Sequence, residues 1–280
     1  MTKRHEVSID YFAFIKLFPR PVLKTFLIPM ELQIITAPSF IKADKSLPEF
    51  AAANESISRY SELNKISPGI FPGAEYLGDA LYLYPEEDVL NKICNSLKDD
   101  PKLLEVALYG LSEGARLKYL KDLALNEKNS QVLTEREIFA KTLGAHLNLS
   151  HLAELHNRED LEQDSKFKSY TQYFETQLCS NIGHYGASTV ENDKLQALSN
   201  SQDSVYGSSI SGAGLGGNNI VLTHKAETQK VKSFLLNNYY AKREDANRID
   251  LSISDGETIL EMAKRDVYLS SSSAPACRLI

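Results

Sequence analysis

Residues 207–221 (GSSISGAGLGGNNIV) are the part of the sequence best suited to hold a ligand, because closely spaced glycines let backbone amides approach it without interference from Cβ atoms. Gly212, Gly214 and Gly217 match G-x-G-x-x-G, but a dinucleotide fingerprint needs a helix directly after the loop, whereas residues 220–222 favour a strand. No G-K-[ST] closes the segment, which excludes a Walker-type loop. The pattern predicts a turn between two strands, either facing a ligand or forming a plain glycine hairpin.

Two further sets of side chains could carry catalysis or bind a metal. Ser150 and His151 are adjacent, and neighbours on a helix point about 100° apart, so they are poorly placed to act as nucleophile and base. His146, His151 and His156 recur at every fifth position, and each such step turns the side chain by about 140° around a helix. No two of them share a face. We therefore predict packing or capping roles, with no catalytic residue and no metal site among them.

Composition narrows the class of protein. A chain of 280 residues with 42% hydrophobic and 24% charged residues can build one sizeable core or two smaller ones. The net charge of −6 and the mixing of both signs predict no nucleic-acid partner. No segment reaches the roughly 18 uncharged apolar residues of a membrane span, and Cys94, Cys179 and Cys277 form no CxxC pair. We expect a cytoplasmic protein without a membrane partner, a disulfide framework or a zinc site.

The elements that must position these residues follow from periodicity and turn signals. Strands are predicted at residues 6–14 and 30–40, and residues 18–29 between them, broken by three prolines, read as a connection. A helix is predicted at 45–65 and a surface loop at 67–88.

Helical periodicity dominates the middle of the chain, and strand signals return near its end. The predicted helices are residues 85–99, 101–125, 134–157 and 166–182. The later elements are a polar stretch at 191–204, strands at 204–211 and 218–224, a helix at 226–242 and a last strand at 266–272. Helices and strands thus occur in blocks, which predicts an α+β protein.

The glycine segment also resembles the third motif of the small-molecule kinases called GHMP kinases, which include galactokinase, homoserine kinase and mevalonate kinase. The usual form is close to GAK(or R)xTGAGxGGCxxxL, and the residues that match it are Gly207, Gly212, Ala213, Gly214, Gly216, Gly217 and Leu222. Ser211 stands for the usual threonine. Ser209 replaces the basic residue and Asn218 the cysteine, so a charge contact from the former position is not expected.

Upstream segments resemble the galactokinase branch in the expected order. Glu113 and Arg116 resemble that branch's ExxR helix, and LGAHLNLSH, which contains Asn148 and His151, resembles its GxLMNxSH segment. Gly144 and Ser150 complete the second match. Asn54 and, in the tail, Pro275, Ala276 and Arg278 also correspond. Ala53 replaces a tyrosine that contacts the sugar in the family, so the resemblance does not extend to this contact.

The resemblance implies a GHMP kinase carboxyl-terminal domain, a ferredoxin-like sheet with packed helices, at residues 86–280. A remnant of the amino-terminal domain, strands and one helix, is expected at residues 1–85. ATP and Mg²⁺ are implied by the resemblance alone. The residues expected to line the phosphate side are Ser211, Gly212, Ala213, Gly214, Leu215, Gly216 and Gly217.

The first two family motifs, with the phosphate-binding serine loop and the catalytic aspartate, have no counterpart in the sequence. The leading hypothesis is a sugar-kinase portion that phosphorylates a sugar hydroxyl together with a separately encoded amino-terminal half. An inactive kinase relic that binds a sugar or a protein is the alternative. A truncated gene product is a third interpretation.

Overall fold

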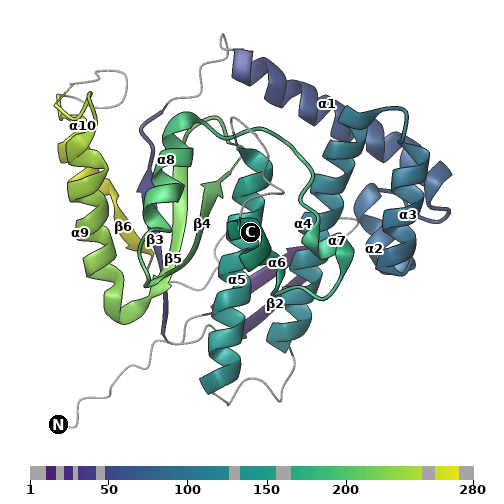
Figure 1. The fold of residues 1–280 in the computed structure, drawn as a ribbon, viewed down its shortest axis with the longest axis horizontal. Helices are drawn as coiled ribbons and strands as arrows, with labels where there is room; N and C mark the ends of the chain where they lie inside the picture. Colours follow the sequence, from purple (N-terminus) through teal and green to yellow (C-terminus); the bar gives the residue numbers. More distant parts are fainter. Residues whose placement is uncertain are drawn as a thin grey trace.

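The computed structural model describes residues 11–16, 22–27, 31–41, 48–125, 133–155, 165–212, 214–247 and 256–270. Its main sheet has four antiparallel strands in the spatial order β4-β5-β3-β6 (Figure 1). These strands are β3 (Leu32–Pro38), β4 (Val205–Ser211), β5 (Asn218–His224) and β6 (Tyr268–Ser270). The predicted strands at 30–40, 204–211, 218–224 and 266–272 are thereby confirmed.

Helices cover both faces of this sheet (Figure 1). Alternate side chains of a strand point to opposite faces, so Ile35 and Val221 pack against α8 (Val190–Ser199), α9 (Thr228–Asn238) and α10 (Ile259–Asp266). Leu32 and Leu222 pack on the other face, against Leu120 and Phe139 of α4 (Pro101–Leu125) and α5 (Leu133–Glu154). The short 3-10 turns η3 (Lys225–Glu227) and η4 (Tyr240–Lys242) flank α9.

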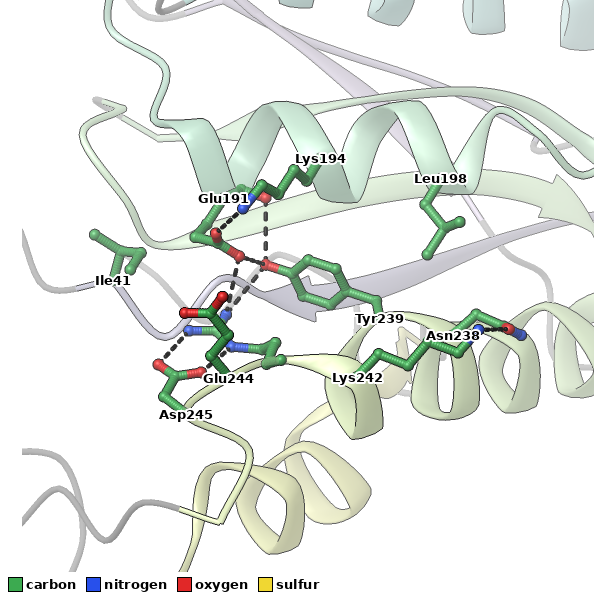
Figure 2. A pocket seen from close by; sticks show the side chains of 10 residues that line it. Ile41, Glu191, Lys194, Leu198, Asn238, Tyr239, Lys242, Glu244 and Asp245 are labelled. Atoms are coloured by element: carbon green, nitrogen blue, oxygen red, sulfur yellow. Dashed lines mark hydrogen bonds and ion pairs between the residues drawn. The ribbon is translucent and has the colours of Figure 1, made fainter.

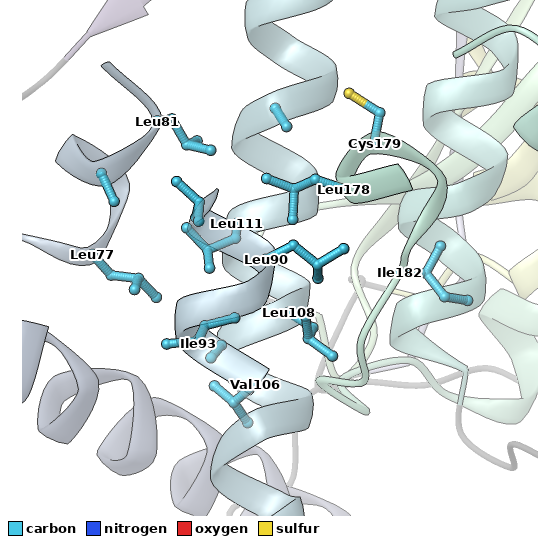
Figure 3. Close-up of a cluster of buried hydrophobic side chains, with 14 of the residues drawn as sticks. Leu77, Leu81, Leu90, Ile93, Val106, Leu108, Leu111, Leu178, Cys179 and Ile182 are labelled. Atoms are coloured by element: carbon cyan, nitrogen blue, oxygen red, sulfur yellow. The ribbon is translucent and has the colours of Figure 1, made fainter. Parts of the chain in front are cut away.

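The remaining helices form a second core beyond α4 (Figure 3). Leu77, Leu111 and Leu178 are buried there, contributed by elements that are far apart in the sequence. The elements that build this core around α4 and α5 are α1 (Pro48–Ile70), η1 (Leu77–Asp79), α2 (Ala80–Leu83), α3 (Glu86–Ser96), α6 (Ser165–Thr171) and α7 (Gln177–Ser180). Helix α4 has the bounds predicted from its periodicity, because Pro101 suits a first helical turn.

The connection predicted at residues 18–29 is wrong, since it contains strand β2 (Val22–Leu27). This strand pairs antiparallel with β1 (Tyr11–Lys16). Pro19, Pro21 and Pro29 all fall outside β2, so six residues remain free of proline and can donate their amides to a ladder.

The loop predicted at 67–88 is wrong in part. Helix α1 continues to Ile70, and η1 and α2 follow within the segment. Burial of Leu77 and Leu81 in the helical core outweighs the local turn signals, and the Leu77 amide donates to Asn64 Oδ1 at 3.1 Å.

One other prediction fails, and one segment forms a helix that its local pattern did not indicate, because tertiary packing overrides that pattern. The helix predicted at 166–182 is divided into α6 and α7, where Thr176 caps α7 by accepting from the Cys179 amide at 3.1 Å. The polar stretch at 191–204, to which no element was assigned, contains all but the first residue of helix α8, whose polar side chains Asn192, Gln196 and Ser199 are buried. The class is α+β, as predicted. The four strands, with helices α8 and α9, follow in the order β3-α8-β4-β5-α9-β6; α4 and α5 lie between β3 and α8 in the sequence, and α10 lies between α9 and β6.

Candidate functional site

The glycine segment is a turn between two paired strands, as predicted. Strand β4 ends at Ser211 and β5 begins at Asn218, and no helix follows the loop. Gly212, Gly214, Gly216 and Gly217 all have positive φ angles, a region that glycine enters without a Cβ penalty. Leu215 also has a positive φ, of 60°. Ala213 lies outside the described residues.

The loop is held on both sides by other parts of the chain. The Leu215 amide donates to the Ala187 carbonyl at 2.5 Å, and the Gly217 amide donates to the Ile41 carbonyl at 3.3 Å. The Ser39 amide donates back to Gly217 O at 2.7 Å. A Cβ at Gly214 would overlap Ala187 O, and one at Gly216 would overlap Ile41 O. These glycines therefore permit a close approach between protein backbones.

The loop by itself does not fit a triphosphate with Mg²⁺. Two of its amides already donate to protein carbonyls, and residues 207–217 contain no lysine or arginine. Binding a transferable phosphate requires positive charge as well as shape. Within the described ranges, no group of three His, Cys, Asp or Glu side chains is placed to hold a metal ion. Any charge that neutralises a nucleotide must come from outside this loop.

A buried carboxylate is hydrogen-bonded directly to Ala187, one of the residues that anchor the loop. Glu154, in the last turn of α5, accepts the Ala187 amide on Oε2 at 3.0 Å and the Ser188 amide on its backbone oxygen at 2.7 Å. Burial raises the pKa of Glu154 to about 7, although the hydrogen bonds from Tyr109 and Ala187 oppose this shift. Burial likewise raises the pKa of Tyr109.

The ExxR residues of α4 form a buried polar cluster with α5. Glu113 Oε2 accepts from Arg116 at 2.8 Å and from Ser150 Oγ at 2.7 Å, while Glu113 Oε1 lies 3.5 Å from His146 Nε2. Burial alone would raise the pKa of Glu113, but His146, Arg116 and the Ser150 hydrogen bond hold it below its ordinary value. Burial lowers the pKa of His146. Arg116 also donates to the backbone oxygens of Cys179 and Asn181.

The other residues of the α5 segment face β4 and α8. Asn148 Oδ1 accepts from the Ser208 amide at 3.0 Å and from Asn200 Nδ2 at 2.7 Å. His151 Nε2 lies 3.1 Å from Asp193 Oδ1, which also accepts from Ser188 Oγ at 2.5 Å. The structure thus brings Ser150 and His151 to different carboxylates, and His156 lies outside the described residues.

Two cavities lie near these elements. The larger, of about 620 Å³, is between α8 and the end of α9, and Ile41, which anchors the glycine loop, lines it (Figure 2). Glu191 in this cavity accepts from Tyr239 Oη at 2.9 Å and lies 3.6 Å from the Arg243 guanidinium. Glu191 is therefore paired with a cation of the same wall. A second cavity, of about 510 Å³, is lined by tyrosines of α6 and β4 and by polar residues that include Glu137 and His224.

The sequence did not single out Glu154, Ala187 or Ile41. Glu154 is followed by no turn signal, and its position on α5 is that of an ordinary helical residue. Ile41 and Ala187 act through their backbone carbonyls, which no side-chain pattern reveals. A dense run of glycines does indicate that some backbone must approach the loop closely, but not which one.

Within the part of the chain that the structure describes, no helix combines the length and apolarity needed to cross a bilayer. No protein-family model matches the sequence. No curated protein matches it either.

Solved structures do match the fold. One of them is the crystal structure of Lactococcus lactis galactokinase complexed with galactose, with a TM-score of 0.52 and 15% sequence identity. The match covers 79% of this chain and 45% of that one, so the chain spans less than half the length of that galactokinase. At this identity the likeness concerns the fold alone. The described chain therefore has a galactokinase-like fold.

Proposed function

We propose that the chain is the carboxyl-terminal portion of a galactokinase-like sugar kinase. In this proposal residues 211–217 form a wall on the phosphate side of a site in which ATP, with Mg²⁺, phosphorylates a sugar hydroxyl. One observation carries it: Asn148, in the segment that resembles GxLMNxSH, accepts from the Ser208 amide of the strand that leads into the glycine loop. Segments that resemble family motifs, 60 positions apart, thus meet at one place.

The fold supports this proposal. The order β3-α8-β4-β5-α9-β6 is that of a ferredoxin-like β-α-β-β-α-β sheet. We propose residues 86–280 as the kinase carboxyl-terminal domain and residues 1–85 as the remnant of the amino-terminal one. Strand β3 precedes this boundary yet pairs with β5 and β6, so the main sheet joins the two parts.

The uncharged loop supports a second part of the proposal, that the chain is incomplete alone. Phosphoryl transfer depends on charge neutralisation and positioning, and the loop offers shape without charge. A separately encoded amino-terminal half is the proposed source of the charge and of the catalytic base. The small-molecule partner is a sugar.

Turnover and calorimetry test the proposal. The purified chain is titrated with Mg-ATP and with galactose, and sugar phosphate is sought by mass spectrometry. Measurable binding of Mg-ATP, lost in Gly214→Val, where the added side chain would overlap Ala187, is the expected result. Gly78→Ala is the matched control, because a Cβ there meets nothing within 4 Å. Absence of nucleotide binding by the folded wild type, both alone and mixed with the amino-terminal half of a galactokinase, would overturn the kinase assignment.

An inactive kinase relic that binds a sugar or a protein is the second candidate, and one observation favours it. Ser209, which replaces the family's basic residue, is 4% exposed, so this position supplies neither charge nor an accessible side chain. Binding of galactose without any binding of Mg-ATP supports the relic. If neither ligand binds, the chain does not bind a sugar, and only a relic that binds a protein is left.

A further inference from the structure

Residues 184–188, which precede α8 and are called the fastened segment below, are held to the last turn of α5 by backbone amides. Tyr185 N donates to Ala153 O at 2.9 Å, Ala187 N donates to Glu154 Oε2 at 3.0 Å, and Ser188 N donates to Glu154 O at 2.7 Å. The bonds from Tyr185 and Ser188 join main chain to main chain. The Ala187 bond alone depends on a side chain, so its strength depends on the charge of that side chain.

Ala187 transmits this bond to the glycine loop. Its amide donates to Glu154, and its carbonyl accepts from Leu215 N at 2.5 Å. Gly214 has no Cβ, so that the loop can lie directly against the Ala187 backbone. A shift of Ala187 must therefore move residues 214 and 215.

The surroundings of Glu154 make its charge responsive. It is 7% exposed, and among the described residues its titratable neighbours are Tyr109 and Glu113 of α4 and Tyr185 of the fastened segment. None of these three is a cation; His184 Nε2 lies 3.4 Å from the backbone oxygen of Leu155, the residue after Glu154. The hydrogen bonds to Glu154 favour its charged form, while burial and the charge of Glu113 oppose it.

We propose that Glu154 is a positioning residue whose carboxylate acts through Ala187 as a proton-sensitive latch on the glycine loop. When the carboxyl is ionised it makes a charge-assisted bond to the Ala187 amide, and when it takes up a proton that bond weakens. The burial described above places this change near neutral pH, since the pKa of Glu154 is about 7. The latch is inferred from the two hydrogen bonds of Ala187, to Glu154 and to Leu215. Its bearing on catalysis rests on the proposed sugar-kinase function.

Amide ¹⁵N–¹H spectra of the full chain between pH 5.5 and 8.5 test the latch without any ligand or activity. The Ala187 and Leu215 amides are expected to titrate with one common midpoint near 7. After correction for intrinsic exchange, protection of the Ala187 amide is expected to fall about fivefold below that midpoint, the difference between a charged and a neutral hydrogen bond, and protection of the Leu215 amide is expected to fall with it.

Variants separate the latch from other titrating groups. Glu154→Gln keeps a hydrogen-bond acceptor and is expected to make both amides independent of pH. His184→Gln is the matched control, because histidine also titrates in this range and His184 lies in the fastened segment. It is expected to leave both titrations in place. If Glu154→Gln does not fold, Tyr109→Phe, which removes a bond to the carboxylate, is expected to raise the midpoint.

Three results would overturn the latch: Leu215 fails to titrate with Ala187, both amides are flat in the wild type, or the titrations vanish in His184→Gln. Each of these outcomes leaves the sugar-kinase proposal untouched. Conversely, absence of nucleotide and sugar binding leaves the pH response of the loop intact.

Discussion

Gly144 of α5 and Gly207 of β4 lie directly against each other's backbones. A Cβ on Gly207 would overlap the carbonyl oxygen of Gly144, and a Cβ on Gly144 would overlap the carbonyl of Tyr206. Helix α5 can therefore approach the edge strand β4 closely enough for Asn148 to reach the strand's free amide. This contact sets the distance between α5 and the strand that enters the glycine loop.

Gly207→Ala should lower the free energy of unfolding by about 1–3 kcal/mol, because the methyl group overpacks a contact between two backbones. Chemical denaturation measures this change. Gly69→Ala is the control: a Cβ there meets nothing within 4 Å, and alanine favours the helix α1 that contains it. An equal loss in both variants would contradict the close contact.

Arg116→Met should cost about 3–5 kcal/mol, because it leaves Glu113 without its main cationic partner in a buried cluster. The side chain of Arg116 is fully buried and also bonds the backbone near α7. Arg265→Met, at an exposed position, should leave the denaturation midpoint unchanged. A stability of Arg116→Met equal to that of the wild type would show that the cluster is not formed.

Asn148→Ala should destabilise the fold by about 1–3 kcal/mol, since it leaves the buried Ser208 amide of an edge strand without an acceptor. Asn237→Ala, on the exposed face of α9, is the matched control. Amide exchange at Ser208 gives a local readout. Undiminished protection of that amide in Asn148→Ala would disprove the proposed bond.

Stability should fall as the pH rises toward and beyond neutrality, because of Glu154. Its pKa is raised from 4.5 to about 7 in the folded protein, so the folded state binds the proton more tightly than the unfolded state. The stabilisation is full below pH 4.5 and lost as the pH rises through 7, by up to about 3 kcal/mol.

Glu154→Gln removes this dependence. Between pH 5 and pH 8 the wild type should lose about 2.5 kcal/mol more than the variant does. Denaturant midpoints of both proteins at the two pH values give the difference directly. Parallel curves would mean that Glu154 ionises at its ordinary pKa in the folded chain.

Local patterns predicted the elements whose sequence and environment agree. The glycine run gave a turn between strands, and the apolar stripe of residues 101–125 gave helix α4, because both signals need no distant partner. Helix α8 was missed because all but one of its buried side chains are polar. Asn192 Nδ2 donates to Asn219 Oδ1 at 2.5 Å, a bond that only the folded sheet provides.

The candidate site was predictable only in outline. Residue types indicated the loop, but its anchors at Ile41 and Ala187 are backbone carbonyls, which carry no sequence signature. Glu154 is equally hidden, since its burial comes from α4 and the segment before α8 rather than from its own neighbours on α5.

The central claim is that the glycine loop faces a nucleotide. Its most direct test is the ¹⁵N–¹H spectrum of the chain with and without a non-hydrolysable ATP analogue and Mg²⁺ at millimolar concentration. The expected result is a set of shifts concentrated in the amides of residues 211–217. Saturating analogue that leaves these amides unmoved, in a protein whose Ala187 amide shows the native pH titration, would contradict it.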